Sequence, residues 1–224
     1  MKNRKRDQFL QNFPLPKGWQ VKKENEKGYH VLLIEDGSVF QLDFRKNKSL
    51  SHSQTLVQAI GFKNQPLSIL DITAGWAKSA FLMRQLGCQV TAIESNPFVF
   101  YLVQESLEYN NADTNQFQIK LDNSLNYLKS LNNPLYYPDI IFMDPMFEGR
   151  KKSLSKKSLR ILKEITGETT DKQALFNRAL LKAKKRVVVK RHKLDKPLQK
   201  NILCSFKGHS VCYDVFNPIG EDRH

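Results

Sequence analysis

The feature that most constrains this chain is an unbroken apolar run at residues 140–143, followed directly by Asp144-Pro145-Met146-Phe147. An apolar run without polar breaks is typical of a strand buried on both faces, as in a parallel sheet covered by helices. Ligands of open α/β sheets bind beyond the carboxyl ends of such strands. The run therefore predicts a parallel α/β sheet whose ligand site includes Asp144.

The Asp-Pro-x-aromatic sequence at residues 144–147 suits the transfer of a group onto the exocyclic amine of a nucleobase. Such an amine is a weak nucleophile because its lone pair is delocalised into the ring. Asp144 and the backbone carbonyl of Pro145 could accept its hydrogen bonds and localise that pair, while Phe147 could stack on a flipped base. The alternative interpretation is structural, an aspartate that ends a strand ahead of a proline turn.

The chain around this run alternates between strand and helix patterns. The expected strands lie at residues 67–72, 88–93, 117–121, 139–143, 187–189, 202–206 and 211–216. The expected helices lie at residues 80–86, 97–110, 124–131 and 170–184. This rhythm predicts a doubly wound, Rossmann-like α/β sheet that closes with a C-terminal β-hairpin.

Residues 1–65 lack this rhythm, and we expect them to form a small N-terminal α+β appendage to a main domain at residues 66–224. The first ten residues have the composition of a loose basic arm. Asp36-Gly37 separates two apolar runs and predicts a hairpin. Residues 52–60 are expected to form a short helix that ends at Gly61.

Small or polar residues follow the ends of four consecutive expected strands. The turn that contains Gly75 opens a helix after the first strand, and Glu94 ends the second, where nucleotide-binding sheets place the acid that binds ribose hydroxyls. Asp122 and Asn123 follow the third strand, and Asp144 follows the fourth. Each alone is as compatible with a cap or a turn, but together they predict a nucleoside cofactor. A GxxxxGKS loop is absent and GxGxxG is incomplete, which favours S-adenosylmethionine (SAM), a cofactor without pyrophosphate, over NAD or ATP.

The composition favours a polyanionic partner. Lysine and arginine number 36 against 22 acidic residues, which gives a net charge of +14. The basic residues that we expect to contact RNA phosphates follow the 144–147 segment or flank the fifth strand: Arg150, Lys151, Lys152, Lys156, Lys157, Arg160, Lys190 and Arg191. The alternative for these residues is a solvated charged face.

Three cysteines, Cys88, Cys204 and Cys212, form no CxxC pair and have no metal-ligand spacing. We therefore expect reduced thiols, no metal and a cytoplasmic protein. No apolar segment follows the basic N-terminus as a signal peptide requires, and no apolar run approaches the length of a membrane span.

A set of motifs spread over residues 67–216 makes the sequence recognisable. In chain order these are DITAG at 71–75, LGCQV at 86–90, Glu94 with Asn96-Pro97, DPMF at 144–147, Lys152-Ser153 with Lys156-Lys157, KKRVVVKR at 184–191 and KGH at 207–209. The combination resembles the ribosomal RNA small subunit methyltransferase J family, which has a class I SAM-dependent methyltransferase fold. Members of this family methylate the N2 amine of a guanine in small-subunit (16S) rRNA.

The resemblance implies SAM as cofactor and small-subunit rRNA, or the small ribosomal subunit, as partner of an expected monomer. It implies cofactor contacts at Lys78, Ser79, Glu94, Ser95, Asn123, Ser124 and Asp144. The chain departs from the family at Ala77, where the family has a second glycine, at Lys78-Ser79, where it has Arg-Asp, and at Ser95, where it has arginine. Two alternatives stay open: an adenine amino-methyltransferase acting on DNA or RNA, and a non-catalytic RNA-binding or ribosome-assembly factor with a degenerate SAM site.

Overall fold

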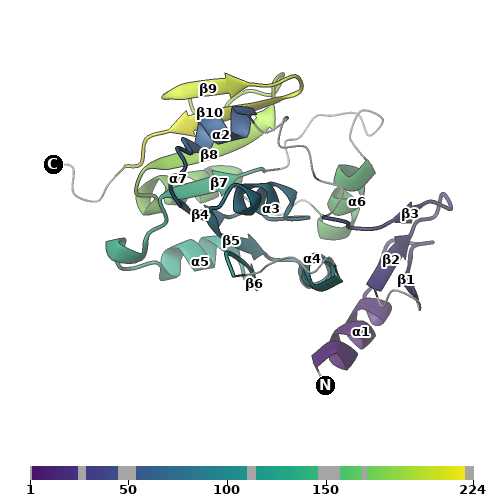
Figure 1. Ribbon diagram of the computed structural model, residues 1–224. Helices are drawn as coiled ribbons and strands as arrows, with labels where there is room; N and C mark the ends of the chain where they lie inside the picture. The colour runs from purple at the N-terminus through teal and green to yellow at the C-terminus, as the bar shows by residue number, and fades with distance from the viewer. Residues whose placement is uncertain are drawn as a thin grey trace.

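The computed structural model describes residues 2–24, 29–44, 54–109, 115–145, 157–167 and 171–219. Its centre is a seven-stranded sheet with the order β6-β5-β4-β7-β8-β10-β9 (Figure 1). The strands are β4 (Ser68–Asp71), β5 (Gln89–Glu94), β6 (Phe117–Leu121), β7 (Ile140–Met143), β8 (Arg186–His192), β9 (Cys204–Lys207) and β10 (Val211–Phe216). The first five pair in parallel, and β10 pairs antiparallel with both β8 and β9. The predicted doubly wound sheet with a C-terminal hairpin is confirmed.

Helices cover both faces of this sheet. Helices α2 (Gln54–Ile60), α3 (Lys78–Gln85) and α4 (Pro97–Tyr109) pack into one hydrophobic cluster, and α5 (Ser124–Ser130) and α7 (Lys172–Lys182) pack into another. A 3-10 helix, η2 (Pro134–Tyr136), precedes β7. Helix α6 (Lys157–Thr166), which the sequence analysis did not predict, lies beyond the sheet on the side of α3 and β3 (Figure 1).

Strand β7 lies in the middle of the sheet and joins both clusters. Ile140 and Phe142 belong to the cluster with α3 and α4, whereas Ile141 and Met143 belong to the cluster with α5 and α7. All four side chains are at most 1% exposed. The prediction of a strand buried on both faces is confirmed, because successive side chains of a strand point to opposite faces.

The N-terminal segment is ordered where the sequence suggested a loose arm. Residues of the arm form α1 (Lys2–Asn12), which packs against α4. The ring centroids of Phe9 and Tyr101 lie 5.1 Å apart, with the two rings tilted. Arg6 forms a bidentate ion pair with Glu108. The prediction of a loose arm was wrong because Phe13 follows Phe9 by four residues and Leu10 by three, the spacing of one helical turn, and the basic residues around them obscure this pattern.

A small antiparallel sheet follows α1. Its strands are β1 (Gln20–Glu24), β2 (Tyr29–Leu33) and β3 (Val39–Phe40), in that order. The β2–β3 pair confirms the hairpin predicted around Asp36-Gly37, whereas β1 was not predicted.

Helix α2 also confirms a prediction, and it lies against the main sheet, where it packs on β8, β9 and β10. Arg186 of β8 donates to the carbonyls of Gln58 and Ala59 in its last turn. The predicted boundary between residues 1–65 and 66–224 therefore does not coincide with a separation in the packing.

Candidate active site

A cavity of about 640 Å³ lies at the carboxyl edge of the parallel strands. This volume falls within the range of small-molecule sites, about 300–1,000 Å³. The residues after the strands that line it are Ile72, Thr73, Gly75, Ser95, Asn96, Asn123, Ser124, Asp144 and Pro145, together with Ile93 and Glu94 at the end of β5. Helices α6 and α7 complete the wall, with Leu162, Lys163, Thr166, Lys172 and Leu175 among their contributions. The cavity thus lies at the edge where the sequence placed the ligand site.

Glu94 is the buried acid of this cavity. Its side chain is 7% exposed, and its two oxygens accept hydrogen bonds at 2.8 Å from the backbone N–H groups of Gly75 and Asn96. Burial raises the pKa of Glu94, although the hydrogen bonds from Asn96 and Gly75 oppose that shift. Glu94 therefore fixes the glycine turn relative to β5 and places a carboxylate in the cavity wall.

The turn itself depends on backbone conformations that few residues adopt. Gly75 has a φ of +50°, and a Cβ at this position would lie 2.8 Å from Cδ2 of Leu162 in α6. Ala77, which replaces the second glycine of the family, also has a left-handed φ of 53°. Its methyl group is fully buried in the hydrophobic core and is not part of the cavity wall.

Asp144 follows β7 and is held at two points. Its backbone N–H donates to Oγ1 of Thr73 at 2.6 Å, and its Oδ2 pairs with Nζ of Lys190 at 2.5 Å. The pairing of Met143 with Val189 puts the two residues side by side at the ends of adjacent parallel strands. The Asp144 side chain is 36% exposed, and Asp144 lines the cavity as well as pairing with Lys190.

Asp71, the last residue of β4, is close enough to Asp144 and Lys190 to interact electrostatically with both. It is 1% exposed and accepts a hydrogen bond from the backbone N–H of Thr73 at 3.0 Å. Burial raises the pKa of Asp71 to about 7, against the opposing effect of the Thr73 hydrogen bond, and the charge of Asp144 adds to the increase. Asp71 was not predicted as a site residue, although it lies at a strand end, the same signal that identified Glu94 and Asp144.

Asp122, Asn123 and Ser124, which follow β6, were all predicted to contact the cofactor, but they do not all line the cavity. Asn123 and Ser124 line the cavity. Asn123 caps α5 by accepting from the Asn126 N–H, and the Ser124 hydroxyl donates to the Ile72 carbonyl at 2.7 Å. Asp122 is exposed and lies outside the cavity wall.

The residues implied at the start of α3 also lie outside the cavity wall, whereas Ser95, after β5, belongs to it. Lys78 is exposed and Ser79 is half-buried. The Ser79 hydroxyl lies 3.5 Å from Nζ of Lys190, which brings α3 into contact with the Asp144 pair instead.

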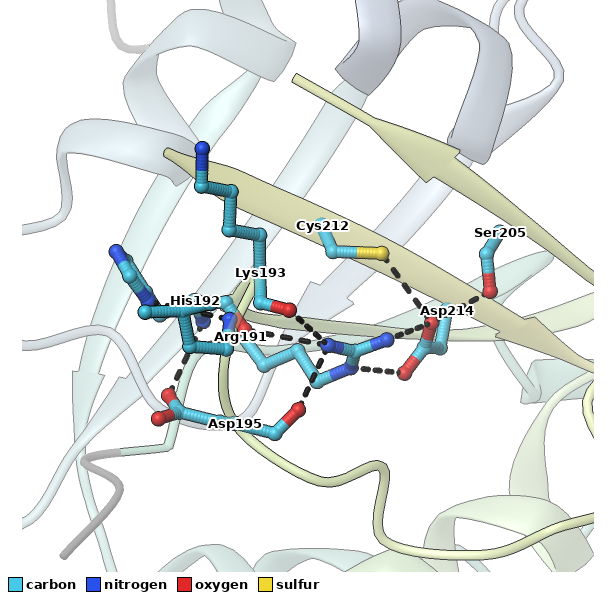
Figure 2. A network of polar contacts seen from close by, with 8 residues as sticks. Arg191, His192, Lys193, Asp195, Ser205, Cys212 and Asp214 are labelled. Carbon is cyan, nitrogen blue, oxygen red and sulfur yellow. Dashed lines mark hydrogen bonds and ion pairs between the residues drawn. The ribbon is translucent and has the colours of Figure 1, made fainter. Parts of the chain in front are cut away.

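Arg191, predicted to contact RNA, points into the protein (Figure 2). Its guanidinium forms a bidentate pair with Asp214 of β10, with Nε at 2.6 Å from Oδ2, and its Nη1 donates to the Asp195 carbonyl at 2.8 Å. Arg191 and Asp214 are 9% and 0% exposed. The guanidinium is thus engaged inside the fold, in hydrogen bonds to Asp214 and to backbone carbonyls.

Several predicted residues fall where the structure gives no description. Phe147, Arg150, Lys151, Lys152 and Lys156 lie outside the described residues. Of the same basic cluster, Lys157 is exposed at the start of α6, and Arg160 is half-buried at 3.6 Å from Asp36. Lys190 forms the ion pair with Asp144 described above.

Comparison with known proteins assigns the chain to a family. Residues 15–218 match the family described as putative SAM-dependent methyltransferase. The chain is 41% identical over 173 residues to ribosomal RNA small subunit methyltransferase J of Coxiella burnetii, an alignment covering 73% of this chain and 66% of that relative. It is 34% identical over 190 residues to the protein of the same name from Buchnera aphidicola, covering 80% and 72%. The chain belongs to the ribosomal RNA small subunit methyltransferase J family. It aligns with about two thirds of the length of its Coxiella relative.

Solved structures agree with the fold. A SAM-dependent methyltransferase from Neisseria gonorrhoeae superposes with a TM-score of 0.72 at 24% identity, over 97% of this chain and 93% of that one. A Thermus thermophilus 16S rRNA N2 G1207 methyltransferase, solved with AdoMet and guanosine, gives a TM-score of 0.53 at 17% identity, over 92% and 52%. The predicted class I methyltransferase fold is confirmed, and SAM, the predicted cofactor, is the cofactor of the family.

Two further observations concern other kinds of site. Among the helices that the structure describes, none is long and apolar enough to cross a membrane. Over the same described ranges, no three His, Cys, Asp or Glu side chains gather closely enough to hold a metal ion.

Proposed function

We propose that this chain is a SAM-dependent methyltransferase that modifies the N2 amine of a guanine in small-subunit rRNA. One juxtaposition carries the proposal: Gly75, Glu94 and Asp144 line the same cavity. Residues that could bind a nucleoside and a residue that could accept hydrogen bonds from an exocyclic amine therefore line the same cavity. The family to which the chain belongs supports small-subunit rRNA as the substrate.

The cavity residues fit SAM. The Glu94 carboxylate would accept hydrogen bonds from the ribose hydroxyls, and the absence of a side chain at Gly75 lets the cofactor approach the turn. Asn123 and Ser95 lie on the same wall, where they can flank the adenine. When bound, SAM supplies a methyl group on a sulfonium sulfur, which keeps the electron pair of the broken S–C bond and leaves as a neutral thioether.

The chain supplies the acceptors for the substrate amine. Asp144, with the backbone carbonyl of Pro145, would accept hydrogen bonds from the two N–H groups and localise the lone pair on nitrogen. That pair forms the new N–C bond, and the nitrogen then loses one proton through the Asp144 carboxylate to water. Asp144 matters most as the nitrogen gains positive charge, so its interaction is stronger in the transition state than in the ground state. Phe147 would stack on the flipped base.

RNA would reach the cavity across the basic segment that follows Pro145. The net charge of +14 supports phosphate contacts, and Lys157 is exposed at the start of α6, whose Leu162 and Lys163 line the cavity. Arg150, Lys151, Lys152 and Lys156 remain proposed contacts of the same surface. Phosphate contacts of this kind position RNA without reading its sequence.

The test is transfer of labelled methyl from SAM to small-subunit rRNA, followed by nucleoside mass spectrometry of the product. We expect N2-methylguanosine at one position. A matched RNA with inosine at that position lacks only the N2 amine, so it should accept no label. Label found as N6-methyladenosine would overturn the guanine assignment. SAM binding by calorimetry without transfer to rRNA or to small subunits would instead indicate a non-catalytic RNA-binding protein.

A further inference from the structure

Asp144, the proposed acceptor for the substrate amine, forms an ion pair with Lys190, which has no role in the proposed chemistry. Nζ of Lys190 lies 2.5 Å from Oδ2 of Asp144, and the same ammonium lies 3.5 Å from the Ser79 hydroxyl. Within the part of the chain that the structure describes, Oδ1 of Asp144 accepts no hydrogen bond. One carboxylate oxygen is therefore engaged and the other is left for a ligand in the cavity.

Lys190 is enclosed by groups from four other parts of the fold. Besides Asp144 after β7 and Ser79 in α3, Tyr213 of β10 and Asp71 of β4 act on it electrostatically. Burial acts to lower the pKa of Lys190, but the charge of Asp144 and the contributions of Tyr213 and Asp71 outweigh it, so the pKa is raised. The side chain is 23% exposed, which leaves little of it for a phosphate of bound RNA.

The backbones on both sides of this pair are fixed. The residue after Lys190 is Arg191, whose buried network ties the end of β8 to β10 and to the following turn (Figure 2). The backbone N–H of Asp144 is held by Thr73. The ion pair therefore joins two anchored strand ends, and it sets the side-chain orientation of Asp144.

We propose that Lys190 is a positioning residue for methyl transfer, which holds Oδ2 of Asp144 so that Oδ1 faces the substrate amine. This inference rests on the proposed function, because it assigns Lys190 a role in the same reaction. It replaces the RNA contact that the sequence suggested for Lys190.

The positioning role of Lys190 and its charge predict opposite effects of its removal on the rate of methyl transfer. The ammonium partly cancels the attraction of Asp144 for the positive charge that develops on the amine. If charge dominated, removing Lys190 would speed transfer. If orientation dominates, removal slows transfer, since misplacement by about 1 Å costs on the order of 10²-fold.

The experiment compares Lys190→Met, Lys190→Arg and Lys185→Met under single-turnover conditions at saturating SAM and RNA. Lys185 is the matched control, because it pairs with Asp139 at 3.0 Å at the other end of the same two strands. We expect Lys190→Met to slow transfer by about 10- to 100-fold, with little change in the SAM Kd or the RNA KM. Lys190→Arg keeps the charge and should recover much of the rate, whereas Lys185→Met should retain the wild-type rate.

Three results would overturn the inference. A wild-type or faster rate in Lys190→Met would show that charge, not orientation, is what Lys190 contributes. A weaker RNA affinity with a smaller salt dependence, at an unchanged saturating rate, would make Lys190 a phosphate contact. Equal losses in Lys190→Arg and Lys190→Met, tracking a fall in Tm, would reduce it to a structural residue. Wild-type protein that methylates no RNA would overturn the proposed function itself, which separates that failure from the other three.

Discussion

Strands β7 and β8 carry an aspartate–lysine pair at each end. At the amino end, Asp139 just before β7 pairs with Lys185 just before β8 at 3.0 Å. At the carboxyl end, Asp144 pairs with Lys190 at 2.5 Å. The residue types and the two strands are the same, but the environments differ.

The amino-end pair is used by the fold. The second oxygen of Asp139 accepts from the backbone N–H and the hydroxyl of Ser68, at 3.0 and 3.1 Å, and so joins the start of β4 to β7. Lys185 is 58% exposed. At the carboxyl end Lys190 is 23% exposed, and Asp144 lines the cavity. The Asp144–Lys190 pair is therefore the candidate for catalysis, because Asp144 lines the cavity at the carboxyl edge, where ligands of open α/β sheets bind.

The largest expected difference between the two ion pairs is in their effect on the rate of methyl transfer. Asp144→Ala should slow single-turnover transfer by about 10²–10³-fold, the usual cost of one well-placed electrostatic partner in a transition state. Asp139→Ala should leave the rate near wild type and lower the free energy of unfolding instead. Labelled methyl transfer at saturating SAM, with a thermal melt of each variant, measures both.

The assignment of different roles to Asp144 and Asp139 would be wrong if their alanine variants had the same effect on methyl transfer. A folded Asp144→Ala protein that transfers methyl within a few-fold of wild type would show that Asp144 does not act on the amine. A rate loss in Asp139→Ala that persists below its melting transition would show that the amino edge also controls the chemistry.

A second prediction concerns the cofactor at the carboxyl edge. Glu94→Ala should weaken SAM binding by about 1.5–3 kcal/mol, the range for losing hydrogen bonds to a charged acceptor. Isothermal calorimetry measures the change, and Asp139→Ala is the control for a carboxylate lost at the other edge. Unchanged SAM affinity in Glu94→Ala would remove Glu94 from the cofactor site.

The centre of the sheet could be predicted from the sequence because its middle strands are buried. Residues such as Ile141 and Val188 belong to apolar runs typical of a covered parallel sheet, and the alternation of strand and helix patterns around them indicates the fold. Helix α6 was missed although Ile161, Leu162 and Ile165 recur at helical spacing and lie in or against the core, because its basic residues were interpreted as part of an RNA-contacting segment. The site could be predicted as far as strand ends are concerned, since Glu94 and Asp144 both end apolar runs.

Partners across strands could not be predicted from the same patterns. Lys190 and Arg191 are adjacent basic residues in the sequence, yet strand alternation sends one side chain to Asp144 and the other to Asp214. Both were interpreted as RNA contacts because a charge count carries no information about the face on which a residue lies. Which residues Lys190 and Arg191 contact depends on the pairing of β8 with its neighbours, and therefore on the sheet order.

The two edges should also respond to pH with opposite sign. Asp71, at the carboxyl edge, has a pKa of about 7, above the value of about 3.9 in an unfolded chain, so wild type loses stability as pH rises between those values. Asp71→Asn should remove this loss, which for one proton has a slope of at most about 1.4 kcal/mol per pH unit. Urea unfolding of both proteins from pH 4 to pH 8 measures the difference.

Asp139 provides the opposite slope. Burial acts to raise the pKa of Asp139, but the Ser68 hydrogen bonds and Lys185 outweigh it and lower the pKa. Its contribution is therefore full above about pH 4, the unfolded value, and is lost as pH falls below it. Asp139→Asn should be less stable than wild type at neutral pH by about 1–3 kcal/mol, and the gap should narrow in acid. Parallel pH profiles for the Asp71 and Asp139 variants would contradict the contrast between the edges.

The smallest expected effects come from two left-handed positions, one near each edge. Gly61, beside the start of β8, has a φ of +65°, and a Cβ there would lie 2.7 Å from Cζ of Arg186. Gly61→Ala should lower the free energy of unfolding by about 1–2 kcal/mol, the cost of a left-handed residue with a side chain. Ala77, near the carboxyl edge, has a φ of 53° and already bears that strain.

Ala77→Gly should therefore change stability little. Relief of about 1 kcal/mol of backbone strain is offset by the loss of a buried methyl group, about 0.8 kcal/mol, and by the greater freedom of glycine in the unfolded chain. SAM affinity should also stay close to wild type, because the methyl group lies in the core and Ala77 is not part of the cavity wall. Urea unfolding and calorimetry check both statements. Clearly tighter SAM binding in Ala77→Gly would mean that the Ala77 methyl group limits the approach of the cofactor, as a second glycine at this position in the family suggests.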